Sequence, residues 1–133
     1  MPTGPVVTRL LLGLIFLVFG LNGFLLFITP PPLPEAAGAL LGALDASMYF
    51  LPVLNMTEIV CGIALLTGVC VPLALIVLAP IVTQIFLFHL VLAPSGLVLA
   101  ILMVILQTYL GFVAYRGNFD ELLILWARPD TEA

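Results

Sequence analysis

Four long apolar stretches dominate the 133-residue chain, and they restrict what it can fold into more than any other feature. A helix needs roughly 20 mainly apolar residues to cross the hydrocarbon core of a bilayer. The stretches reach this length, and they cover residues 10–28, 49–67, 72–92 and 95–115. The sequence therefore predicts an all-α integral membrane protein, in which residues 1–133 form a single domain built as a four-helix bundle.

The composition of the chain agrees with a lipid environment. Hydrophobic residues make up 64% of it and charged residues 8%, whereas a soluble domain carries about 25% charged residues. A soluble chain with so few charges could not cover its own surface. The three basic residues form no basic stripe, which excludes nucleic acid as a partner; they are Arg9, Arg116 and Arg128.

The same arginines predict the direction of insertion. Arg9 precedes the first apolar stretch, Arg116 and Arg128 follow the fourth, and residues 29–48 contain no Lys or Arg. Because basic residues collect on the cytoplasmic side of a membrane, both termini are expected in the cytoplasm. The 29–48 connection is then expected on the outer side.

The long connection between the first two spans has the pattern of a short helix. Pro34 and the residue after it are typical of a helix start. Leu40, Leu44 and Met48 recur every four residues, which places them on one side of such a helix. We expect this helix to lie in the outer interface of the membrane.

The tail after the fourth span is patterned in a similar way. Phe119, Leu122, Leu123 and Trp126 follow the i, i+3, i+4, i+7 spacing of an apolar helix face, and Asn118 is a suitable N-cap. This pattern predicts a short amphipathic helix on the inner membrane surface, with a frayed tail as the alternative.

Polar side chains inside the spans are the candidates for function, because such residues are costly in lipid and usually face the bundle interior. Counting along each span at about 1.5 Å per residue places Gln107 alone in the inner half of the membrane. Five others share the outer half, and they are Asn22, Asn55, Glu58, Gln84 and His89. We expect these five to form a polar pocket beneath the helix of the first connection.

Glu58 is the most unusual of these residues. No Lys or Arg lies at its depth, so its carboxyl group is expected to be protonated. In that state it can donate a hydrogen bond, and Asn22, Asn55 and Gln84 are the amides within reach. Two interpretations stay open: Glu58 handles a ligand or a proton, or it belongs to a hydrogen-bond network that holds helices together.

The histidine and cysteine content gives little support for a metal or thiol site. His89 is the only histidine and no Cys/His cluster exists, so no metal site is expected. Cys61 and Cys70 would lie about 13 Å apart along a helix, which is too far for a disulfide. Packing cysteines are favoured over a redox pair, a hydrogen-bonded wall residue is favoured for His89, and no catalytic residue can be named.

Several runs of the sequence resemble the DoxX-like family of small integral membrane proteins. They are RLLLGLIFLVFGLN at 9–22, EIVCGIALLTG at 58–68, PLALIVLAP at 72–80, FLFH at 86–89 and APSG at 93–96. The similarity covers nearly the whole chain, and the segments around Glu58 and His89 are its most specific parts.

This resemblance implies a four-span domain of the bacterial inner (cytoplasmic) membrane. Some relatives are subunits of thiosulfate:quinone oxidoreductase, which implies a membrane subunit of a quinone-linked redox system. A bound quinone or lipid and a redox partner subunit follow from that role, since no residue of this chain could carry electrons. Two alternatives stay open: a non-enzymatic binder or carrier of a small lipophilic molecule, and an assembly scaffold for other membrane proteins. The oligomeric state is also open, and it includes a homo-oligomer.

Overall fold

The computed structural model describes residues 3–29 and 31–127, with the backbone alone for residues 122–127, and this part of the chain contains helices and connections but no strand. Four helical stretches are long and apolar enough to cross a membrane. Three are α1 (Thr3–Leu25), α3 (Phe50–Thr67) and α4 (Val71–Val91). The fourth runs from Pro94 to Ala114 and joins a 3₁₀ turn, α5 (Leu97–Tyr109) and a π-helical turn (Leu110–Ala114). The expected all-α four-helix bundle is confirmed, and its helices are those of a multi-pass membrane protein.

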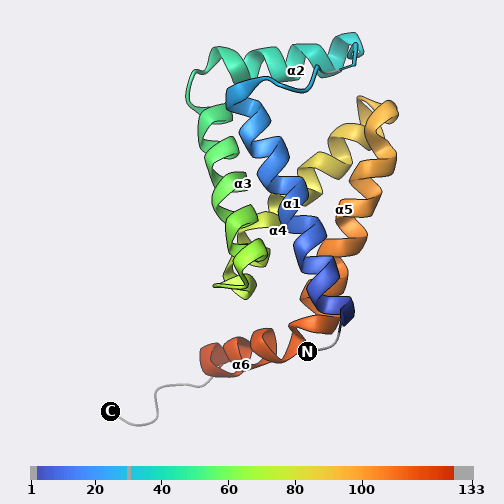
Figure 1. Cartoon of the computed structure of the whole chain (residues 1–133). Coiled ribbons are helices and arrows are strands. Elements are labelled where there is room, and N and C mark those ends of the chain that lie inside the picture. The colour runs from blue at the N-terminus through green and yellow to red at the C-terminus, as the bar shows by residue number, and fades with distance from the viewer. Residues whose placement is uncertain (1–2, 30, 128–133) are drawn as a thin grey trace.

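Two shorter helices lie across opposite ends of the bundle (Figure 1). Helix α2 (Glu35–Ala46) follows α1 and crosses one end, which we name the α2 end. Helix α6 (Arg116–Ala127) crosses the other, the α6 end, where α1 also begins. Both positions fit helices that lie in the plane of a membrane surface.

Helix α1 packs most extensively against α3, and glycines allow the two backbones to approach closely. A Cβ atom at Gly62 would lie 2.8 Å from the backbone nitrogen of Leu17 and 2.9 Å from the carbonyl oxygen of Gly13. At Gly20 a Cβ atom would lie 2.9 Å from the carbonyl oxygen of Asn55. Small residues at such contacts are the usual basis of helix pairing in membranes, where apolar burial adds little.

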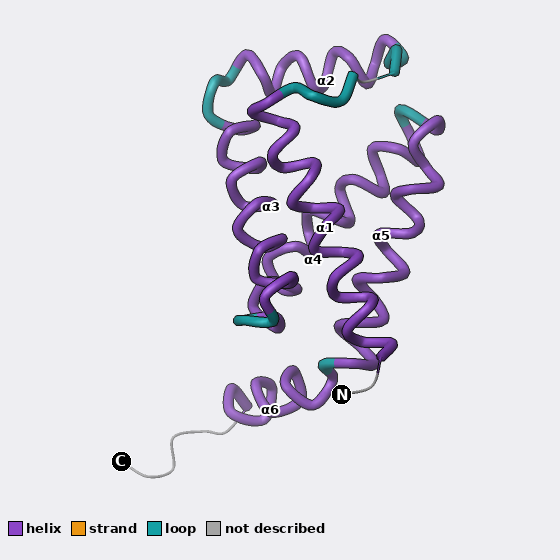
Figure 2. The backbone as a smooth tube through the Cα atoms, viewed as in Figure 1, coloured by secondary structure: helices purple, strands orange, loops and turns teal. Residues whose placement is uncertain are grey.

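The hydrophobic core is concentrated toward the α6 end. Its α4 members all precede Thr83, and its α5 members all follow Leu102, so the tip of the α4–α5 hairpin lies outside it. Figure 2 shows the consequence, because α4 and α5 diverge from α1 and α3 toward the α2 end. The buried cluster consists of Leu12, Phe16, Cys61, Leu65, Val71, Ala74, Leu75, Leu78, Val82, Met103, Leu106 and Leu110.

The boundaries of the first span differ most from the sequence prediction. Helix α1 covers residues 3–25 rather than 10–28, whereas the other three helical stretches shift by one residue at most at either end. Its end is set by Leu26, which has a left-handed φ of 52°. The side-chain oxygen of Asn22 then accepts a hydrogen bond of 2.7 Å from the backbone N–H of Ile28.

Arg9 consequently lies within α1 and not before it. Its guanidinium group contacts Gly68, the left-handed residue that ends α3. A cation at this place faces the negative end of the α3 dipole. The pairing of α1 with α3 therefore continues to the end of α3, whereas the first turn of α1 extends beyond it to Tyr109.

The short helices confirm the patterns in part. Helix α2 forms as expected, but its buried residue is Ala37, and Met48 follows the helix end with 84% of its surface exposed. The predicted face of Leu40, Leu44 and Met48 is therefore wrong, because Met48 adopts a left-handed φ of 68° in the turn to α3.

Helix α6 is also present, although it begins at Arg116 rather than after Asn118. The expected packing of Leu122, Leu123 and Trp126 lies outside the described side chains.

Candidate functional site

Glu58 is buried in the bundle, as expected. It shares one face of α3 with Cys61, Gly62 and Leu65, and 7% of its surface is exposed. Among the described residues, Glu58 is the one charged residue that is buried. In the part of the chain that the structure describes, no hydrogen bond joins it to Asn22, Asn55 or Gln84, so the predicted hydrogen bonds are not formed.

The two asparagines, Asn22 of α1 and Asn55 of α3, have separate local roles. The amide of Asn22 closes the end of α1 through Ile28. The side chain of Asn55 packs directly on Gly23, where a Cβ atom would overlap it. Asn55 therefore helps to join α3 to α1 at the α2 end, whereas Asn22 stabilises the end of α1 itself.

Gln84 and His89 are placed apart from these residues by the divergence of the hairpin. Gln84 is exposed on α4, so the expectation that it faces the bundle interior is wrong. His89 is half-buried at the end of α4, where its Nδ1 donates a hydrogen bond of 3.1 Å to the carbonyl oxygen of Ala93. Its ring also packs on Gly96, so it holds the α4–α5 connection in place.

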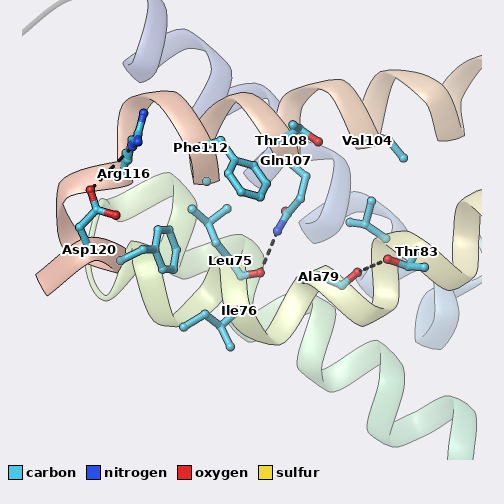
Figure 3. A pocket seen from close by; sticks show the side chains of 13 residues that line it. Leu75, Ile76, Ala79, Thr83, Val104, Gln107, Thr108, Phe112, Arg116 and Asp120 are labelled. Carbon is cyan, nitrogen blue, oxygen red and sulfur yellow. Dashed lines mark hydrogen bonds and ion pairs between the residues drawn. The ribbon is translucent and has the colours of Figure 1, made fainter. Parts of the chain in front are cut away.

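A groove of the described part of the chain lies elsewhere, between α4 and α5 near the α6 end (Figure 3). Its volume is about 800 Å³, and none of the five predicted residues lines it. Ile76 and Phe112, which do line it, are exposed on the membrane-spanning surface. The groove therefore opens sideways toward lipid. Phe119 and Asp120 of α6 border its lower end.

Gln107 provides the polar centre of this groove. Its Nε2 donates a hydrogen bond of 2.8 Å across the helix pair to the carbonyl oxygen of Leu75. A carbonyl can only accept, so this bond fixes the orientation of the amide and leaves Oε1 as its other end. Oε1 is buried and has no hydrogen-bond partner among the described residues. An unsatisfied buried acceptor is costly. Oε1 is covered by neighbouring atoms, so a ligand donor in the groove satisfies it when those side chains move aside.

Two backbone irregularities shape the walls of the groove. Pro80 lies inside α4 and has no N–H to donate to the carbonyl of Ile76, which lines the groove. On the other wall, residues 110–114 form a π-helical turn that contributes Gly111 and Phe112. Such turns are frequent at functional sites, because they redirect side chains at one position of a helix.

Three other polar residues of the groove, Thr83, Arg116 and Asp120, are paired locally. The Thr83 hydroxyl donates a hydrogen bond of 2.8 Å to the carbonyl of Ala79. Arg116 and Asp120 form an exposed ion pair with a 3.7 Å separation at the lower end of the groove (Figure 3). An exposed pair of this kind contributes about 0–1 kcal/mol, so both groups stay available to a ligand or to lipid head groups.

No protein family, characterised protein or solved structure matches this chain. The likeness to DoxX-like proteins thus stays an expectation from the sequence. Within the described residues, no group of three or more His, Cys, Asp or Glu side chains could hold a metal ion.

Several features of the sequence point to the groove when they are taken together. Gln107 was recognised as a polar residue of the inner half of the membrane, and Pro80 is a visible interruption of the third span. The short connection between the last two spans predicts that they pack as antiparallel neighbours. Combining these signals would have placed an amide beside an interrupted helix, which is the arrangement that the structure has.

Proposed function

We propose that this protein binds a small lipophilic molecule with a polar head group in the groove between α4 and α5. The supporting observation is Gln107, whose amide is anchored at one end and unpartnered at the other, beside a groove of about 800 Å³. Pockets for small molecules usually measure about 300–1,000 Å³ and combine apolar walls with a few well-placed polar groups.

The chemistry of the groove favours a head group that donates hydrogen bonds. Gln107 Oε1 has no hydrogen-bond donor among the described residues. The Ile76 carbonyl lacks its helical N–H donor, because residue 80 is proline. Both groups are acceptors. A hydroxyl group would complement them, whereas a second carbonyl would not. The walls of Leu75, Val82 and Val104 suit an aliphatic or ring-shaped body.

A quinol combines these properties, and the resemblance to DoxX-like proteins independently favours a molecule of the quinone class. In this proposal the chain is the membrane subunit of a redox system in the bacterial inner membrane that holds the quinol. The quinol forms when a partner subunit supplies the electrons to the quinone. Glu58, a buried acid of α3, is its candidate proton-handling group.

Filling part of the groove is expected to weaken binding about tenfold without disturbing the fold. A Cβ atom at Gly111 would meet nothing within 4 Å, so Gly111→Leu adds its side chain to open space. Ligand atoms contribute roughly 0.3 kcal/mol each or more, so displacing about four of them weakens binding about tenfold. Binding of decylubiquinol, measured by native mass spectrometry of the purified protein in detergent, checks this expectation.

Gly42→Leu is the matched control, because Gly42 also has open space around it but lies on α2. It should bind decylubiquinol like the parent protein. Equal binding by the Gly111→Leu variant would exclude the groove as the site. No binding by the parent, either of decylubiquinol or of decylubiquinone, would contradict the quinone class.

The proposed orientation places the α6 end in the cytoplasm. A cysteine at the exposed Ala39 is then expected to react with a membrane-impermeant maleimide from outside, and one at the exposed Asn118 only after permeabilisation. Both variants carry Cys70→Ala, because Cys70 is exposed whereas Cys61 is buried. Ala37 is unsuitable for labelling, since it is fully buried. The opposite labelling pattern would reverse the orientation.

A further inference from the structure

Helix α4 presents a regular stripe of exposed residues to its surroundings. Successive members are spaced by 4, 3, 4, 3 and 4 residues, which is the heptad spacing of a coiled-coil seam. All are exposed, with 61% of Leu73 and 69% of Val91 accessible at the two ends. The stripe consists of Leu73, Val77, Pro80, Gln84, Leu87 and Val91.

Gln84 distinguishes this stripe from an ordinary lipid-facing surface. It is an exposed amide within a membrane-spanning helix, and no described residue shares a hydrogen bond with it. Three threonine hydroxyl groups on the spans differ from Gln84 in this respect, since Thr57, Thr67 and Thr83 donate hydrogen bonds to carbonyls of their own helices. A glutamine side chain is too polar to face hydrocarbon at no cost, and such groups usually hydrogen-bond to another helix.

The stripe lies on the side of α4 between two grooves. On one side of α4 lies the α4–α5 groove described above, which takes in Ile76, Ala79 and Thr83. On the other side lies an apolar groove of about 430 Å³ between α3 and α4, which takes in Leu73 and Val77. Helix α4 therefore separates two grooves, and the stripe runs along its exposed side between them.

We propose that two copies of this chain pair through this stripe, with their α4 helices parallel and their Gln84 side chains hydrogen-bonded across a two-fold axis. An amide carries both a donor and an acceptor, so two identical glutamines on the axis complement each other. All copies insert in the same direction, so a two-fold axis along the membrane normal makes the helices parallel.

The residue types of the seam agree with such a pair. If Gln84 occupies an a position, the other a positions are Val77 and Val91, and the d positions are Leu73, Leu87 and, between them, Pro80. β-branched residues at a with leucine at d favour two parallel strands, and a polar residue at one a position fixes the register. This surface is separate from the ligand groove, so the proposal does not depend on the proposed function.

Cysteine cross-linking in membranes tests the geometry. In a Cys70→Ala background, cysteines placed singly at Val77 and Val91, which leave Gln84 in place, are expected to form disulfide-linked dimers on mild oxidation. Val98 and Ile105 on α5 are the controls, because they are as exposed but lie on another helix. Cross-linking at the α5 positions that equals or exceeds that at the α4 positions would overturn the proposal.

Association in lipid tests the role of the glutamine. Gln84→Leu is expected to weaken dimerisation about threefold to twentyfold, whereas Gln84→Asn should retain most of it, since interhelical hydrogen bonds have effects of this size. Single-molecule photobleaching of the labelled protein across a range of protein-to-lipid ratios provides the measurement. Gln84 is exposed, so circular dichroism should show the parent helix content in both variants. A parent protein that stays monomeric at every ratio, or a Gln84→Leu variant that dimerises like the parent, would refute the pairing.

Discussion

Replacing Gly62 with alanine is expected to lower the free energy of unfolding by about 1–3 kcal/mol, the usual cost of overpacking a well-packed contact. The added methyl group would lie 2.8 Å from the backbone nitrogen of Leu17 and 2.9 Å from the carbonyl oxygen of Gly13. Neither atom can rotate away, because both belong to the backbone of α1. The two helices must therefore move apart along their whole contact. Unfolding by SDS titration in mixed micelles, followed by circular dichroism, measures the change.

Gly42→Ala is the matched control for this prediction. It makes the same chemical change in a helix, but a Cβ atom there meets nothing within 4 Å. Its free energy of unfolding should stay within a few tenths of a kcal/mol of the parent value or rise slightly, because alanine favours helix over glycine. A Gly62→Ala variant as stable as this control would show that α1 and α3 do not depend on close backbone contact.

Replacing Glu58 with methionine is expected to raise the free energy of unfolding by about 1–3 kcal/mol, the cost of a buried polar group without a partner. Methionine has a similar volume, and no hydrogen bond to a described residue is lost with the carboxyl group. The same titration measures this change. Decylubiquinol binding in the α4–α5 groove should be unaffected, because Glu58 does not line the groove.

Glu58→Gln is the companion variant, since it keeps a polar side chain but removes the titratable proton. Its stability should resemble that of the parent. If Glu58 handles protons, quinone-linked activity in membranes is lost in both variants although both fold. A Glu58→Met variant that loses 1 kcal/mol or more would instead favour a structural hydrogen-bond network.

Most of the fold could be predicted because long apolar helices leave few choices. Span length and short connections determined the four helices and their neighbours. The start of α1 was missed because residues 3–9 include polar side chains that tolerate a helix without requiring one. The end of α1 was missed because Leu26 adopts a left-handed conformation, which is unusual for leucine. The residue types around position 26 therefore do not predict where the helix ends.

The candidate site was predicted less well, because depth in the membrane does not determine direction around a helix. Asn22, Asn55, Glu58, Gln84 and His89 were placed at similar heights, and the apolar spans gave no strong amphipathic pattern to show which way each one faces. Glu58 was placed correctly in the interior. Gln84 was not, because the prediction assumed that every polar residue turns inward within one chain.

The unequal distribution of the core also has a mechanical consequence. Side chains lock the four helices together near the α6 end, whereas none of the core residues of α4 or α5 belongs to the hairpin tip. The bundle is therefore held together at the α6 end, and the α1–α3 and α4–α5 helix pairs separate toward the α2 end. The free energy of local opening is lowest where few side chains are packed. The α4–α5 connection is therefore the part of the bundle that moves away from the other helices most easily. Lateral pressure in one leaflet would change the separation of the α1–α3 and α4–α5 pairs at the α2 end, whereas the joined end, which contains the α4–α5 groove, keeps its shape.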